Sequence, residues 1–145
     1  KIGAIGHSLG GHNSLYTAAF EDRVKVVVSS CGFDSFLDYM DGNVKGWTGV
    51  RYMPRLLDFK LEEIPFDFHE VLSVIAPRPI YVNAPIGDAN FRWRSVDRVG
   101  KAAGTVYEFL GATGALAIEH PDVGHSFPLA QRESAYAVIE KALKQ

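Results

Sequence analysis

The sequence predicts an α/β protein of three layers, in which helices cover both faces of a mainly parallel sheet of about four strands. Short apolar, β-rich runs alternate with helix-like stretches along the 145 residues. Strands that alternate with helices in this way form parallel sheets. No internal repeat, low-complexity segment or linker interrupts the order. The length suits a single domain, 1–145, that buries a sizeable core.

The first half of the chain supplies two strands and one helix. The apolar run Ile2–Ile5 predicts the first strand. Gly11–Phe20 carries apolar residues three and four apart and ends at a charged turn, which indicates a helix. Val24–Ser29 is a continuous apolar run, as in parallel strands that are buried on both faces.

The second half supplies two further strands and three helices. Phe68–Ile75 and Arg92–Leu110 have helical apolar spacing, and a glycine directly follows the longer of the two. Pro128–Leu143 opens with a proline, which is favoured in the first turn of a helix. Between these stretches, Pro79–Ala84 and Leu116–Glu119 predict the third and fourth strands.

Residues 33–65 break the alternation of strands and helices. So long a connection inside a compact domain is usually functional. The segment is rich in aromatic residues and glycine, so we interpret it as an insertion that forms a lid or a pocket wall. The alternative is an irregular loop with a small apolar cluster of its own.

The pentapeptide Gly6-His7-Ser8-Leu9-Gly10 lies between the first strand and the first helix. Strand, sharp turn and helix are the context of a nucleophile elbow, in which a strained turn exposes the central serine. Glycines at the flanking positions remove Cβ atoms that would clash in such a turn. The motif therefore predicts Ser8 as a catalytic nucleophile.

Partners for a serine nucleophile follow two later strands. Asp88 comes after the third strand and His125 after the fourth, which is the order Ser, Asp, His of the α/β-hydrolase plan. In such a triad the histidine takes the serine proton and the acid orients the histidine. The sequence predicts a serine hydrolase that cleaves carboxylic esters or small amides through an acyl-enzyme.

Several residues compete for these roles. Asp34 follows the second strand and is the best alternative acid, while Asp122 is interpreted as a turn residue. His12 falls in the first turn of the following helix. Surface or structural roles are expected for the other histidines outside the proposed triad, His69 and His120.

The oxyanion hole requires two N–H donors. The backbone N–H of Leu9, directly after the nucleophile, is expected to be one of them. The other normally comes from a loop upstream of the elbow, where this chain has no residues. The alternative function is therefore a truncated, catalytically weak or inert module that acts in binding or assembly.

Aromatic and histidine side chains are the candidates for the substrate pocket. They are His7, Trp47, Tyr52, Phe91 and Trp93. No cofactor and no metal is expected, because the histidines lack a metal-binding spacing and one cysteine cannot build a structural zinc site. That cysteine, Cys31, follows an apolar run and is interpreted as a small buried hydrophobic residue.

Composition limits the partners. The apolar fraction of 47% and the charged fraction of 22% are ordinary for a soluble globular protein. The net charge is −2 without a basic cluster, so nucleic-acid binding is not expected. No apolar run reaches the ~18 residues of a membrane span. The expected partner is a small-molecule ester or amide, and the compartment stays open.

The motifs together resemble the α/β-hydrolase superfamily. The resemblance is carried by Gly6–His12, Ala76–Pro79, Gly87–Asp88 and Gly124–Phe127. It is similar in particular to the prolyl-oligopeptidase and dienelactone-hydrolase-like group, which includes acylaminoacyl peptidases and acetyl-xylan-type esterases. The resemblance implies an esterase, with an acylaminoacyl or prolyl-type peptidase as the alternative.

This resemblance covers only the C-terminal half of such a catalytic domain. Family members have several strands and helices before the elbow, so the chain is expected to be a fragment or a truncated form. Its first strand, Ile2–Ile5, would then leave an unpaired sheet edge. We therefore expect a homo-oligomer, a dimer, that forms through this edge.

Overall fold

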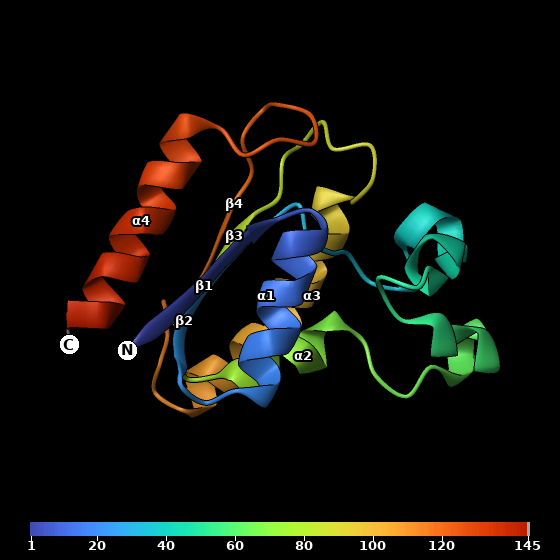
Figure 1. The fold of residues 1–145 in the computed structure, drawn as a ribbon, viewed down its shortest axis with the longest axis horizontal. Helices are drawn as coiled ribbons and strands as arrows, with labels where there is room; N and C mark the ends of the chain where they lie inside the picture. The colour runs from blue at the N-terminus through green and yellow to red at the C-terminus, as the bar shows by residue number, and fades with distance from the viewer. Residues whose placement is uncertain (145) are drawn as a thin grey trace.

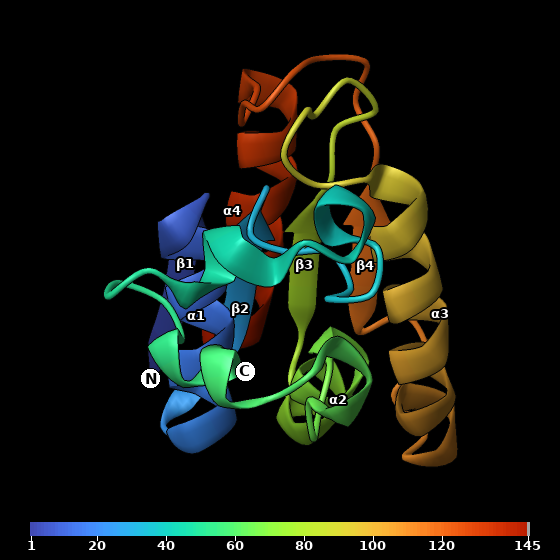
Figure 2. The ribbon, with the colours of Figure 1, turned by 90° about the vertical axis from the view of Figure 1, so that its right-hand side faces the viewer.

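The computed structural model describes residues 1–144 and contains one parallel sheet (Figures 1 and 2). Its four strands lie side by side in chain order, β1-β2-β3-β4. The bounds are Ile2–His7 for β1, Val24–Ser30 for β2, Ile80–Asn83 for β3 and Leu116–Glu119 for β4. All three neighbouring pairs are parallel, so the carboxyl ends of the strands meet at one edge.

Four α-helices cover the two faces of this sheet. Helices α1 (Leu9–Phe20), α2 (Phe68–Ile75) and α3 (Trp93–Phe109) lie on one face, and α4 (Leu129–Lys144) lies on the other (Figure 1). The predicted three-layer α/β class is therefore confirmed. No helix in residues 1–144 combines the length and the apolar character that crossing a membrane requires.

The structure corrects the predicted boundary between β1 and α1. The strand extends to His7, and the helix begins at Leu9 rather than at Gly11. Only Ser8 separates the two elements. The pentapeptide pattern places Leu9 and Gly10 in the turn, but both already lie in the first turn of α1 because the reversal is completed at Ser8.

The main core lies between the sheet and helices α1–α3. It includes Leu15, Val27, Leu72 and Ile80, each with no exposed surface. A smaller cluster of Val28, Tyr81 and Ala135 lies on the α4 side. Burial on both faces explains why β2 and β3 read as continuous apolar runs in the sequence.

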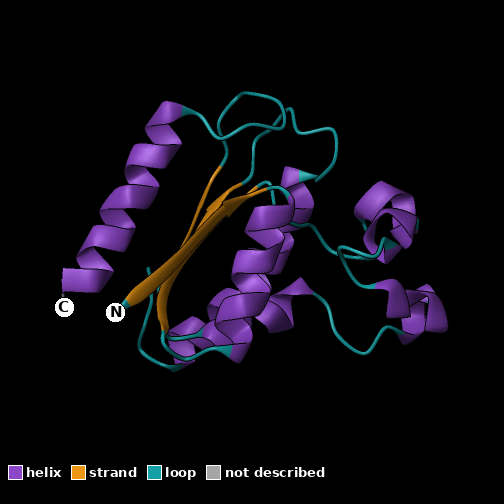
Figure 3. Cartoon of the chain, viewed as in Figure 1, coloured by secondary structure: helices purple, strands orange, loops and turns teal. Residues whose placement is uncertain are grey.

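Residues 33–65 contain short 3₁₀ turns and no strand, and they project beyond the carboxyl edge of the sheet (Figures 1 and 3). Two ion pairs attach the segment to α3 and the residue before it. Asp38 contacts Arg98 at 2.7 Å, and Asp41 contacts Arg92 at 2.6 Å. Asp67, the N-cap of α2, also accepts hydrogen bonds from Ser35 and Phe36. The segment is thus held against the domain by polar contacts and by buried side chains that join the main core, among them Phe36, Trp47 and Leu56.

Strand β1 pairs only with β2 among the described residues, so its other edge lacks a partner there. Ile2 and Ile5 on this strand are 49% and 43% exposed. We propose that a second copy of the chain pairs along this edge. Light scattering after size exclusion is expected to give the mass of a dimer.

A charge on the edge strand tests this proposal. Ile5→Lys is expected to give a monomer, because charged side chains on an edge oppose pairing with another strand. Val50→Lys, at a 93% exposed position in the 33–65 segment, is the control and should leave the dimer intact. A monomeric wild-type protein would contradict the proposal.

Candidate active site

Ser8 forms the whole turn between β1 and α1. Its backbone has φ 54° and ψ −121°, a conformation that residues with a Cβ atom rarely adopt. Two hydrogen bonds hold it: Ser8 N–H donates to the Ser30 carbonyl at 2.8 Å, and the Ser8 carbonyl accepts from His12 N–H at 3.0 Å. This is the strained strand-to-helix turn that the pentapeptide predicts.

The two glycines that flank this turn differ in their environment. A Cβ atom on Gly6 would lie 2.1 Å from the backbone of Gly10, so glycine is required there. A Cβ atom on Gly10 would meet nothing within 4 Å. The expectation that both positions avoid a clash is correct for Gly6 and wrong for Gly10, which faces open space from the first turn of α1.

Asp88 and His125 are in direct contact. Both carboxylate oxygens of Asp88 lie 3.0 Å from Nδ1 of His125. The Asp88 side chain is only 1% exposed, and its Oδ1 also accepts from the backbone N–H groups of Asn90 at 2.8 Å and Phe91 at 3.3 Å. Because these donors hold the carboxylate in place, it can fix the imidazole with the proton on Nδ1.

The loops that carry this pair are bonded to each other along their length. Backbone N–H groups of the loop after β3 donate to carbonyls at the end of β4 and in the loop that follows it. The pairs are Ala84 with Glu119 at 2.9 Å, Ile86 with Pro121 at 3.0 Å and Gly87 with Val123 at 3.0 Å. The relative position of Asp88 and His125 is therefore set by the backbone as well as by their own contact.

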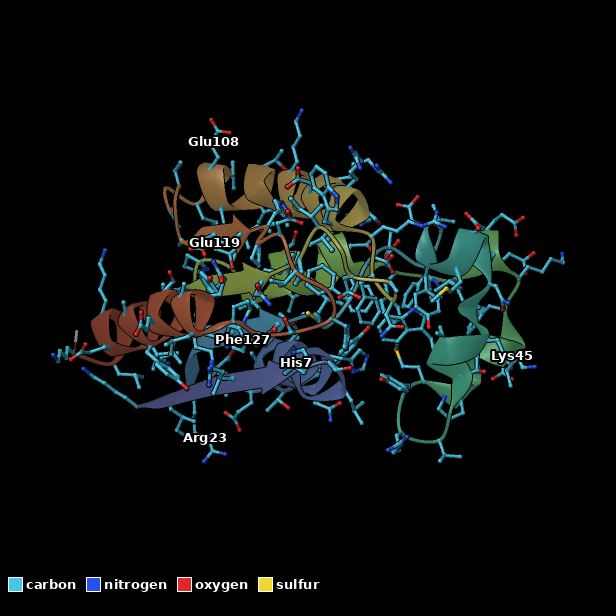
Figure 4. The ribbon with its side chains drawn as sticks, turned by 90° about the horizontal axis from the view of Figure 1, so that it is seen from above. His7, Arg23, Lys45, Glu108, Glu119 and Phe127 are labelled. Carbon is cyan, nitrogen blue, oxygen red and sulfur yellow. The ribbon has the colours of Figure 1, made fainter. Side chains whose placement is uncertain are left out.

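His7, which directly precedes Ser8, lies next to His125. The imidazole rings of His7 and His125 are 4.9 Å apart between centroids. Figure 4 shows His7 at the carboxyl end of β1, on the side where the 33–65 segment with Lys45 projects. No hydrogen bond joins Ser8 to His125 within residues 1–144. Catalytic contacts of this kind often tighten only when substrate binds.

Asp34, the alternative acid, does not contact His125 in the described part of the chain. Its Oδ2 accepts from the backbone N–H of Arg92 at 3.0 Å, and its buried Oδ1 has no partner among residues 1–144. Burial raises the pKa of the Asp34 carboxyl to about 7. The structure thus brings Asp88 rather than Asp34 to the histidine. Asp122 is exposed.

The remaining histidines lie elsewhere. His12 is buried and stacks near Tyr16. His69 lies 3.7 Å from Glu70 on α2. His120 is bonded through Nδ1 to the Ala84 carbonyl at 2.7 Å and through Nε2 to Asp97 at 2.9 Å.

Three of the predicted pocket residues form one aromatic cluster. The Trp47 ring lies 5.3 Å from Tyr52 and 5.6 Å from Phe91, and Phe91 lies 6.0 Å from His125. Trp47 itself is only 1% exposed, so it packs behind the other two rings of the cluster. Trp93 lies outside the cluster: its ring contacts His120 at 5.1 Å and the Arg94 guanidinium at 4.3 Å.

Cys31, Asp88 and His125 place their ligand atoms within 4.8 Å of one another. These are the residues that could hold a metal ion at this site. Burial raises the pKa of the Cys31 thiol to about 12, which keeps it protonated and makes it a poor ligand. The absence of a metal stays a prediction.

Sequence reasoning missed two polar residues beside the site. Asn83 and Ser30 are the last residues of β3 and β2, and neither has exposed surface. Their side chains are hydrogen-bonded to each other, and each has a further partner: Ser30 contacts His7 on β1, and Asn83 donates to the Ser126 carbonyl. The sequence signal that could have identified them is a polar residue at the carboxyl end of an otherwise apolar parallel strand.

Comparison with known proteins identifies the fold. The chain is 21% identical to a carbohydrate esterase family 15 glucuronoyl esterase from Caldicellulosiruptor kristjansonii, with a TM-score of 0.79 over 97% of this chain and 42% of that one. The chain has an α/β-hydrolase fold. No family model matches it.

Two curated relatives of the chain are hydrolases by name. The chain is 30% identical to the putative hydrolase YtaP of Bacillus subtilis over 99% of this chain and 46% of that protein. It is 24% identical to the carbohydrate esterase MZ0003 of an unknown prokaryotic organism over 84% of this chain and 30% of that protein. The chain spans less than half the length of each relative. None of these three carries the name of the prolyl-oligopeptidase or dienelactone-hydrolase group, so that narrower resemblance stays a prediction.

Proposed function

We propose that the chain carries the catalytic residues of a serine esterase. The observation that supports this most strongly is the buried Asp88 carboxylate at 3.0 Å from His125 Nδ1, at the same sheet edge as a strained serine turn. The relatives named above support ester cleavage over the peptidase alternative, since two of the three are esterases by name.

In this proposal Ser8 Oγ attacks the ester carbonyl carbon while Nε2 of His125 takes its proton. The same proton then passes to the alcohol oxygen as the carbon–oxygen bond breaks, which leaves an acyl group on Ser8. Water attacks this acyl group with His125 again as base and releases the acid. Asp88 keeps the Nδ1 proton in place and stabilises the imidazolium that forms in each step.

The backbone N–H of Leu9 is the proposed oxyanion donor. Leu9 is the first residue of α1, and N–H groups in the first turn of a helix have no partner within the helix. They also lie at the positive end of the helix dipole, which favours a developing negative charge. In this fold the second oxyanion donor normally comes from a loop before the elbow. Activation of Ser8 as a nucleophile is therefore tested separately from turnover of an ester.

For the substrate we propose an ester carried by a carbohydrate. This rests on the relatives, because MZ0003 is a carbohydrate esterase and the solved structure is a glucuronoyl esterase by name. We take the aromatic cluster beside His125 as one wall of the proposed site. Trp47 and Phe91 are 1% and 9% exposed, so the partly exposed Tyr52 is the ring proposed to stack on a sugar. We propose that residues 33–65 contribute to this wall through Trp47 and Tyr52.

A fluorophosphonate probe tests the nucleophile directly. The wild-type protein is expected to be labelled at Ser8, and Ser8→Ala is expected to lose both the label and the hydrolysis of a methyl glucuronate ester. Ser73→Ala on α2, whose hydroxyl donates to the His69 carbonyl, is the matched control and should be labelled like the wild type. Equal labelling of Ser8→Ala and wild type would contradict the proposal, and absent labelling of both would favour the inert module.

A further inference from the structure

The amide of Asn83 joins the loop of His125 to the strand beside the elbow. Asn83 has no exposed surface, and its Nδ2 lies 2.8 Å from Ser30 Oγ and 2.9 Å from the Ser126 carbonyl. Ser126 directly follows His125 in the chain. A buried amide without such bonds would be unfavourable, so these contacts determine where it points.

The orientation of this amide follows from its partners. A backbone carbonyl can only accept hydrogen bonds, so the Asn83 atom that faces Ser126 must be the nitrogen. The opposite orientation would set two acceptors against each other. The Cys31 thiol also lies 3.5 Å from the same carbonyl, as a second donor. The amide therefore donates both to the carbonyl after His125 and to the Ser30 hydroxyl.

The Ser30 hydroxyl in turn determines which ring nitrogen of His7 carries the proton. Because its oxygen accepts from Asn83, its own hydrogen is free to donate. The two acceptors in reach are His7 Nδ1 at 3.0 Å and Cys31 Sγ at 3.8 Å, and sulfur is the weaker of the two. His7 Nδ1 thus accepts, which puts the ring proton of His7 on Nε2.

We propose that Asn83 is a positioning residue that fixes, with one amide, both the loop that carries His125 and the neutral tautomer of His7. This inference rests on the proposed esterase function. The titratable groups that face His7 are His125, after β4, and Asp88, after β3; burial and His125 lower the pKa of His7. A neutral His7 leaves the imidazolium of His125 without a second positive charge 4.9 Å away.

Asn83→Asp replaces the amide donor with an acceptor of nearly the same shape, so the hydrogen bonds from residue 83 to His7 reverse their direction. Its carboxylate accepts from Ser30, whose oxygen then accepts from His7, and it repels the Ser126 carbonyl. The ¹⁵N shifts of the His7 ring are expected to move from a proton on Nε2 to a proton on Nδ1. We expect kcat to fall between about 10-fold and 100-fold with little change in KM, since the loop of His125 moves.

Ser30→Ala separates the two arms of the network. The variant removes the hydrogen bond from residue 30 to His7, whereas Asn83 keeps its bond to the Ser126 carbonyl. The His7 tautomer is therefore expected to become mixed. His7 also loses the donor that favours its neutral form, so we expect the acidic limb of the pH–rate profile to move to higher pH. Ser29→Ala is the control, because its buried hydroxyl has no partner in the described part of the chain. It should leave both readouts unchanged.

The ¹⁵N shifts of the His7 ring test the direction of the hydrogen bonds, and this measurement does not require enzymatic activity. A proton on Nδ1 in the wild type, or a Ser30→Ala protein with the wild-type tautomer and pH profile, would overturn the inference even if Asn83→Asp fails to fold. Failure of the fluorophosphonate to label wild-type Ser8 would instead contradict the esterase proposal. The two failures are therefore distinguishable.

Discussion

Replacing Asp88 with asparagine is expected to lower kcat for ester hydrolysis by about 10⁴-fold, the size of the effect in serine proteases of known mechanism. In the native site Oδ1 accepts from the N–H groups of Asn90 and Phe91. In Asp88→Asn the amide oxygen keeps these donors, so the NH₂ group faces His125. Nδ1 must then accept and the ring proton moves to Nε2, where it prevents His125 from taking the proton of Ser8.

Asp34→Asn is the matched control for this variant. Asp34 follows β2 and was the alternative acid, but its carboxylate bonds to the N–H of Arg92, and no contact joins it to His125 within residues 1–144. An asparagine oxygen can accept the same bond, so kcat is expected to stay within a few-fold of wild type. Steady-state kinetics on one nitrophenyl ester compares the two. A large loss in Asp34→Asn with little loss in Asp88→Asn would reverse the assignment of the acid.

Gly6→Ala is expected to destabilise the folded protein by about 3 kcal/mol, the upper end of the usual cost of overpacking, since backbone rather than a flexible side chain has to move. The added Cβ atom would lie 2.1 Å from the carbonyl carbon and oxygen of Gly10 and 2.7 Å from the nitrogen of Gly11. Both residues belong to the first turn of α1. The strand and the helix would have to separate at the elbow, and domains of this size have few kcal/mol to lose.

Gly10→Ala, on the other side of the same serine, is expected to have the opposite effect. Its Cβ atom meets nothing within 4 Å, and alanine in a helix is favoured over glycine by about 0.5 to 1 kcal/mol. Urea denaturation of the two variants measures both effects on one scale. Similar unfolding midpoints for Gly6→Ala and Gly10→Ala would show that the close approach at Gly6 does not restrict the turn.

The fold class was predictable because burial leaves a clear mark on parallel strands. Residues 26–28 and 80–82 are buried throughout, because both faces of β2 and β3 are covered there, so they read as continuous apolar runs. The order of strands and helices then limits the topology, because connections between parallel strands cross over through helices. The same rule accounts for the candidate site, since Ser8, Asp88 and His125 each follow a strand and parallel strands end at one edge.

The ends of elements and the buried polar contacts were not predictable in this way. The start of α1 at Leu9 depends on how far the Ser8 turn reverses the chain. The position of Trp47, almost fully buried beside His12, Phe68 and Phe91, depends on how residues 33–65 pack against α1, α2 and the loop before α3. No local pattern in the sequence reports such packing.

The sequence by itself determined the α/β class, the serine turn and the chain order of Ser8, Asp88 and His125. Each of these is a local pattern, because periodicity, glycine spacing and strand-following polar residues are read along the chain. Only the tertiary structure decided that Asp88 rather than Asp34 contacts His125, and that Asn83 joins Ser126 to Ser30. Hydrogen bonds between residues far apart in sequence depend on distances of a few tenths of an ångström, which follow from packing of the whole domain.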